Sequence, residues 1–161
     1  MSAGMSADGL VLALRGAHTR WKLRRCAEVG RGAVALGTIW VHGPGTVRVG
    51  ERVVLDGRVA PIELHAGPGA EIVLAHDVRV GAGASLEAGR SIRVGAGATL
   101  GRFCKVLDNH FHRVSARSER PASQPVIIEE DADIGMRAVL LPGAHVGRGA
   151  SVGPRTVLAR R

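Results

Sequence analysis

The chain has 161 residues, a length that suits one domain, and hydrophobic residues make up 45% of it. Only 2% of the residues are aromatic and none is tyrosine, so a core has to be filled by aliphatic side chains and alanine. The net charge of +8 would suit nucleic acid, an anionic membrane surface or a phosphorylated ligand. The scarcity of stacking aromatics argues against binding to RNA or single-stranded DNA. Neither a bilayer-spanning apolar run nor a cleavable signal is present, so we expect a cytoplasmic protein.

Residues 1–25 differ in pattern from the rest of the chain. Apolar and basic side chains alternate there, with Leu10, Leu14, Trp21 and Leu23 set against Arg15, Arg20, Lys22, Arg24 and Arg25. This pattern predicts an N-terminal cap or arm, helical or irregular, that covers the open end of a domain spanning residues 26–161. The alternative is a basic segment that rests on a membrane.

From Ile128 onward, an aliphatic residue recurs at every sixth position. The series is Ile128, Ile134, Leu140, Val146, Val152 and Leu158. Four positions after each of the first five stands a small or β-branched residue, namely Ala132, Ala138, Ala144, Ala150 and Thr156. The same signal occurs upstream with interruptions, in segments that open at Val29, Val49, Val80 and Val94.

A period of six fits neither the 3.6-residue repeat of an α-helix nor the two-residue alternation of an amphipathic strand. It fits short parallel strands wound around a triangular prism, with three hexads in each coil and coils stacked roughly 4.8 Å apart. The sequence therefore predicts an all-β fold, a left-handed parallel β-helix of hexapeptide repeats. Cys104 falls on a small-residue position and is expected in the core, and Cys26 is a second isolated thiol without metal-site spacing.

The repeat stops between Val106 and Val126, where residues 107–125 are polar and rich in arginine. A solenoid that projects a loop of this size usually does so for a function. Two histidines, His110 and His112, stand near the root of this projecting loop. We therefore expect the chemistry of the protein at the place where the repeat is interrupted.

The segments VLDNHFHRV and PVIIEEDADIGMRAVLLPGAHVGRGASVGPRTVLAR resemble the hexapeptide-repeat O-acetyltransferases, which include galactoside, maltose, xenobiotic and polysaccharide acetyltransferases. The resemblance is closest from about residue 100 to 160. It implies a homotrimer with active sites between subunits, acetyl-CoA as co-substrate, no required metal, and a sugar or other hydroxyl acceptor, with an amino acceptor as the alternative.

The resemblance also implies roles for individual residues. A loop-root histidine acts as general base on the acceptor hydroxyl; this is His112, because Val106, Asp108, Phe111 and His112 follow the order of the polysaccharide-type members. His110 is the alternative base. Asp108 either orients the imidazole or caps the turn. Acetyl-CoA lies beside the last coils, which points to Gly135, Met136, Gly153, Pro154, Arg155 and Arg160.

Two other functions stay open. Asp133 stands where many relatives have an aromatic residue, Met136 replaces a small or polar residue, and the chain stops soon after the last repeat, which together favour a degenerate member or a non-catalytic scaffold. The other alternative is a metal enzyme like the γ-class carbonic anhydrases, in which His110 and His112 would bind zinc with a third histidine from His65, His76 or His145.

Overall fold

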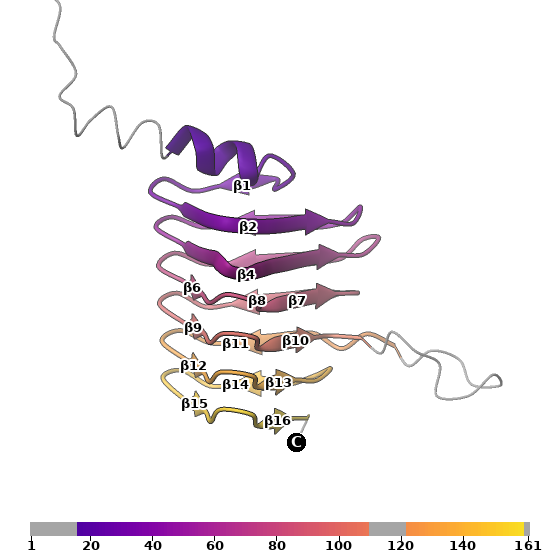
Figure 1. The fold of residues 1–161 in the computed structure, drawn as a ribbon. Coiled ribbons are helices and arrows are strands. Elements are labelled where there is room, and N and C mark those ends of the chain that lie inside the picture. Colours follow the sequence, from indigo (N-terminus) through magenta and orange to yellow (C-terminus); the bar gives the residue numbers. More distant parts are fainter. Residues whose placement is uncertain (1–15, 110–121, 160–161) are drawn as a thin grey trace, which may run out of the picture.

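The computed structural model describes residues 16–109 and 122–159, which form a parallel β-solenoid of about six turns (Figure 1). The coils stack so that each strand pairs in parallel with the strand of the next coil. The fold class predicted from the six-residue period is therefore confirmed. The division at residue 25 into a cap and a solenoid stays a prediction.

The strands lie on three faces. One face is a six-stranded sheet in the order β1 (Glu28–Val29), β3 (Thr46–Val49), β5 (Glu71–Leu74), β8 (Ser91–Val94), β11 (Val126–Ile128) and β14 (His145–Val146). The long strands β2 (Val34–His42) and β4 (Val54–Ala66) each contribute to both of the other faces. We call these the β6 face and the β7 face.

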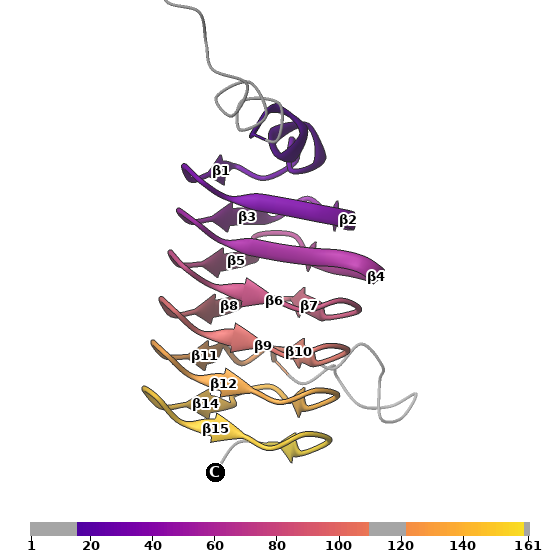
Figure 2. The same cartoon turned by 60° about the vertical axis from the view of Figure 1, so that its left-hand side comes forward.

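The β6 face continues from β4 through β6 (Arg79–Val80), β9 (Thr99–Leu100), β12 (Asp133–Ile134) and β15 (Ser151–Val152). The β7 face continues from β4 through β7 (Ser85–Ala88), β10 (Lys105–Leu107), β13 (Val139–Leu140) and β16 (Val157–Leu158). Figure 2 shows the two faces side by side, with the six-stranded sheet behind them.

The core is a stack of aliphatic layers, one for each coil. The residues of the hexad series from Ile128 to Val146 are at most 3% exposed, as expected from their period. The two-residue shift between Ile92 and Val94 is not a break, because both side chains point inward from β8 and are at most 2% exposed. Two inward positions on one strand, the second and the fourth of β8, lengthen the coil without disturbing the core.

Residues 16–22 are helical and lie over the first coil (Figure 1). Leu23, just after this helix, is fully buried in the core. The Ala35 N–H donates to the Thr19 hydroxyl at 3.2 Å, and the Lys22 amine donates to the Gly37 carbonyl. These contacts hold the helix onto the end of the solenoid. Within the described residues, no helix is long and apolar enough to cross a membrane.

Three edges, each formed by the turns between two faces, separate the faces of the solenoid. The loop edge joins the β7 face to the six-stranded sheet and includes residues 43–45, 67–70, 89–90, 108–109 and 122–125. The Arg137 edge joins the β6 and β7 faces and includes residues 101–104, 135–138 and 153–156. The Asp77 edge joins the six-stranded sheet to the β6 face and includes residues 50–53 and 75–78.

Candidate functional site

Asp108 is the fully buried anchor of the projecting loop. Its carboxylate accepts hydrogen bonds from three consecutive backbone N–H groups of the preceding coil: Gly89 at 2.5 Å, Arg90 at 2.7 Å and Ser91 at 2.6 Å. The Asn109 side chain donates a fourth at 3.0 Å. Both carboxylate oxygens thus accept hydrogen bonds that close the turn. The other role expected for Asp108, orienting an imidazole, involves residues outside the described ones and stays a prediction.

The two ends of the loop meet at this anchor. The Gln124 N–H donates to the Asp108 carbonyl at 2.8 Å, and the Asn109 amide donates to the Glu87 carbonyl at 3.3 Å. The loop therefore leaves and rejoins the solenoid at one point of the loop edge. His110 and His112, the two expected bases, lie outside the described residues, and their roles remain predictions.

The expected coenzyme residues gather on a different edge. Gly135 and Met136 follow β12, and Gly153, Pro154 and Arg155 follow β15 in the next coil, so all five lie on the Arg137 edge. The Arg155 N–H donates to the Met136 carbonyl at 2.9 Å, which stacks the two turns directly. Arg160 lies outside the described residues.

Gly135 is required by coil packing. A Cβ atom there would lie 2.5 Å from the Pro154 nitrogen and 2.7 Å from the Gly153 carbonyl carbon, which are backbone atoms of the next coil. The absence of a side chain thus lets adjacent turns touch. Any contact of this residue with a ligand would be additional to that role.

Phe103 and Arg137 are residues of the same edge that the sequence analysis missed. Both take left-handed backbone conformations, with φ of 58° and 60°, as does Arg155 at 59°. The Arg137 guanidinium lies 5.8 Å from the centroid of the Phe103 ring, and Phe103 is 39% exposed. Because the three residues hold the same turn position in successive coils, their side chains form one column. This column exposes two cations and an aromatic face.

The outer surface of the β7 face lies between these two edges and changes in character along the solenoid. Toward its last coils it is apolar, because Val139 and Leu141 are half-buried and Val157 is 62% exposed. Toward its first coils it is polar, with Glu63, His65 and Glu87 in the row of outward positions. The root of the projecting loop at Asp108 and the five described coenzyme candidates therefore flank a single surface.

Two histidines on this surface contact each other. His42 ends β2 and pairs in register with His65 of β4. Their Nδ1 atoms are 2.8 Å apart, and His42 Nε2 lies 2.7 Å from Glu63 Oε1. The side chains of His42 and Glu63 are 41% and 36% exposed. The six-residue period did not predict this cluster, and only His65 had been considered, as a third zinc ligand.

A hollow of about 630 Å³ lies on the other side of the loop edge, over the six-stranded sheet. Its lining includes Arg48, Arg90, Arg93 and Glu71, and Pro125 from the end of the loop forms one side. Arg93 donates to Glu71 at 2.7 Å, and the paired guanidinium lowers the pKa of that carboxyl. The hollow has room and positive charge for an anionic group.

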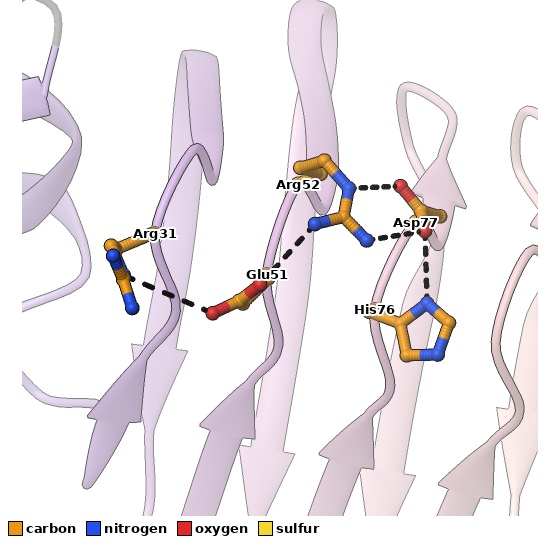
Figure 3. A network of polar contacts seen from close by, with 5 residues as sticks. All are labelled: Arg31, Glu51, Arg52, His76 and Asp77. Carbon is orange, nitrogen blue, oxygen red and sulfur yellow. Dashed lines mark hydrogen bonds and ion pairs between the residues drawn. The ribbon is translucent and has the colours of Figure 1, made fainter.

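The Asp77 edge carries a ladder of charged side chains that pair with one another (Figure 3). Arg52 donates to both oxygens of Asp77 at 2.7 and 2.8 Å, and His76 Nδ1 lies 2.8 Å from the same carboxylate. Arg31 and Glu51 extend the ladder toward the first coil. Hydrogen bonds from Arg52 and His76 hold the pKa of Asp77 well below its usual range. Such exposed pairs contribute little to stability, and because these side chains pair with one another we assign no ligand site to this edge.

The described residues form neither a metal-binding cluster nor a thiol with a lowered pKa. Over residues 16–109 and 122–159, no three His, Cys, Asp or Glu side chains come together in a way that could hold a metal ion. Of the third ligands considered, His145 contacts Glu129 at 2.7 Å. Burial raises the pKa of the Cys104 thiol to about 12 and that of Cys26 to about 11, so both thiols are unreactive.

Comparisons with known proteins give the fold. No protein-family model and no curated protein sequence matches the chain. A variant of AntD, an N-acyltransferase from Bacillus cereus, in complex with dTDP and coenzyme A has a similar structure: TM-score 0.70, 16% identity, 88% of this chain and 77% of that chain covered. AntD in complex with dTDP and 3-hydroxybutyryl-CoA gives a TM-score of 0.67 at 14% identity, with 88% and 78% covered.

A weaker likeness is to the polysialic acid O-acetyltransferase OatWY, with a TM-score of 0.43, 17% identity, and 83% and 78% of the two chains covered. The AntD comparison confirms the expected likeness to β-helix acyltransferases at the level of the fold.

Proposed function

We propose that this protein is an acyltransferase that uses an acyl-coenzyme A, acetyl-CoA in the simplest case, and transfers the acyl group at the β7 face. The observation that carries the proposal is the arrangement of this face: cationic and glycine-rich turns along one edge, an anchored loop along the other, and an apolar surface between them. The AntD structures, which contain coenzyme A on a similar solenoid, support it.

In this proposal the coenzyme phosphates lie against Arg137 and Arg155. Guanidinium groups bind phosphate oxygens through paired N–H donors, and Phe103 offers a flat apolar contact beside them. The arm that carries the thioester crosses the apolar part of the β7 face, over Val139 and Val157. The thioester then reaches the loop edge, where an acceptor hydroxyl or amine attacks its carbonyl carbon and the thiolate leaves.

Calorimetry with acetyl-CoA tests the binding step. Arg155→Gln and Arg137→Gln should each weaken binding about ten-fold, or about 1.4 kcal/mol, and reduce its dependence on salt. Arg79→Gln is the matched control, because it removes the same charge from the exposed surface of the β6 face. Binding that is absent at millimolar acetyl-CoA, or equal in all three variants, would rule out this site.

His112 is the proposed general base, with His110 as the alternative, on the strength of the sequence resemblance. Replacing His112 by alanine should abolish transfer and leave acetyl-CoA binding intact, because the base acts on the acceptor and not on the coenzyme. Unchanged turnover would transfer the role to another residue.

We also propose that the protein is a homotrimer with each site completed by a neighbouring subunit. Sedimentation equilibrium of the purified chain tests this, and a monomer at micromolar concentration would contradict it. The AntD structures contain dTDP, so a nucleotide-linked sugar is a reasonable acceptor, and the hollow beside Arg48 and Arg93 has room for its phosphates.

A further inference from the structure

Glu63, His42 and His65 form one continuous chain of contacts. Its proton positions follow when Glu63 is ionised and both imidazoles are neutral. An ionised carboxylate only accepts, so the group that faces Glu63 Oε1 at 2.7 Å is an N–H on His42 Nε2. A neutral imidazole carries one N–H, which leaves His42 Nδ1 as an acceptor. The facing atom at 2.8 Å, His65 Nδ1, is then the donor. The lone pair of His65 therefore lies on Nε2.

His65 is partly buried and belongs to the outward row of the β7 face, and its Nε2 atom is the acceptor that the pair presents. This Nε2 atom has no hydrogen-bond partner in the part of the chain that the structure describes. A proton that arrives there makes His65 an imidazolium, and the charge is shared through the His42 ring toward Glu63. A second proton would place two N–H donors against each other across 2.8 Å.

The location of this pair fits a role at the loop edge. His65 stands in register with Glu87 of β7, and Glu87 with Leu107 of β10, where the projecting loop begins. Two coil spacings, roughly 10 Å, separate His65 from that point. His65 therefore belongs to the same surface across which the acyl group would be delivered.

The charges around His65 differ from those of the whole molecule. The chain has a net charge of +8, yet the strands packed beside His65 present Glu63 on β4 and Glu87 on β7, with His42 on β2. Lys105 on β10 is the nearest facing cation by register, one coil beyond Ser85. A locally acidic surface attracts a cationic group and disfavours an anionic one.

We propose that His65 is a catalytic residue that takes a proton from a primary ammonium group of the acyl acceptor, with His42 and Glu63 as positioning residues; this rests on the proposed acyltransferase function. A primary amine with an ordinary pKa near that of lysine, about 10.4, arrives as an ammonium ion and has to lose two protons during acylation, whereas a hydroxyl loses one. A surface with a second proton acceptor beside the loop suits the amine.

The reaction balances without any further reactant. The ammonium gives one proton to His65 Nε2, and the freed nitrogen lone pair forms a bond to the thioester carbonyl carbon. The C–S bond breaks and its electron pair stays on sulfur. The second proton leaves the nitrogen for the base at the loop or for the thiolate. The products are an amide, free coenzyme A thiol and one released proton.

The test combines one matched variant with two measurements on the full chain. His65→Asn keeps an N–H that can donate to His42 but removes the acceptor at the Nε2 position. With acetyl-CoA and an amine acceptor such as dTDP-4-amino-4,6-dideoxyglucose, we expect kcat to fall at least 100-fold. The acid limb of its pH profile should also be lost. Glu63→Gln should keep this limb but displace it, and His76→Asn on the Asp77 edge should behave as wild type.

The proton positions are measured separately by imidazole nitrogen NMR without any substrate. We expect an Nε2–H tautomer for His42 and an Nδ1–H tautomer for His65, and the opposite tautomer on His65 would overturn the inference. Three further results would overturn the inference. The first is a wild-type pH profile in His65→Asn, and the second is transfer only to the hydroxyl analogue dTDP-glucose. The third is bound acetyl-CoA with no transfer to any amine. Failure to bind acetyl-CoA would instead overturn the proposed function, whatever the NMR result.

Discussion

At the scale of single residues, Asp108 shows how one side chain can anchor a loop. Its carboxylate replaces the hydrogen bonds that three turn N–H groups would otherwise make with water. Hydrogen bonds to a charged acceptor are each worth about 1.5–3 kcal/mol, and unmet donors are costly. The loop root is therefore fixed by hydrogen bonds between a side chain at the start of the loop and backbone N–H groups of the preceding coil.

Replacing Asp108 by alanine should lower the free energy of unfolding by about 3 kcal/mol, because all three donors lose their acceptor. Asp108→Asn should cost less, since one oxygen still accepts. Urea denaturation measures both. Asp133→Ala, an exposed site on β12, is the control and should stay within about 0.5 kcal/mol of wild type. An equally small effect for Asp108→Ala would mean that water replaces the carboxylate.

The role of Asp108 could not be decided from the sequence, for a physical reason. Its partners are backbone groups about eighteen positions earlier, and only the stacking of coils brings them together. The His42–His65 pair was missed for a related reason. These two residues are twenty-three positions apart, whereas an uninterrupted coil repeats at eighteen, as from Ile128 to Val146. A search by strict period cannot align them.

At the scale of elements, the strands were predictable and the turns were not. The inward residues of each short strand obey the six-residue period because each must fill the same narrow core. The turns obey close packing instead. Position 135 has no room for a side chain because the backbone of the next coil passes within contact distance. Phe103 and Arg137, in contrast, adopt a left-handed backbone conformation while carrying a full side chain. The family resemblance assigned Gly135 to coenzyme binding, which stays a prediction, and it did not single out Phe103 or Arg137.

A pair of glycine substitutions separates packing from ligand binding at this element. Gly135→Ala should lower the free energy of unfolding by about 2 kcal/mol or more, because its Cβ would overlap backbone atoms of the next turn. Gly147→Ala is the matched control, since a Cβ there meets nothing within 4 Å, and it should stay within about 0.5 kcal/mol. Thermal and urea unfolding measure both. If Gly135→Ala proved stable but failed to bind acetyl-CoA, ligand binding would be the constraint.

At the scale of the whole molecule, each surface site is formed by side chains of adjacent coils that stack on one another. Over residues 16–109 and 122–159 each strand pairs with the strands of the neighbouring coils, so the polar first coils and apolar last coils of the β7 face can differ without disturbing the core. The proposed coenzyme surface and the proposed proton acceptor are thus separable by mutation. The same one-dimensional arrangement makes local stability depend on how many neighbours a coil has.

Amide hydrogen exchange should show this dependence as a gradient along the chain. The strands β5 and β8 lie between covered coils and their inward side chains are at most 2% exposed, whereas Val152 and Leu158 of the last strands are only partly buried. We expect slow exchange over residues 72–94 and fast exchange over 151–158, measured by mass spectrometry of peptic fragments. Equal protection of both segments would mean that another surface covers the last coil in solution. Dilution would then distinguish a second copy of the chain, whose protection falls with concentration, from a contact within the chain, whose protection does not.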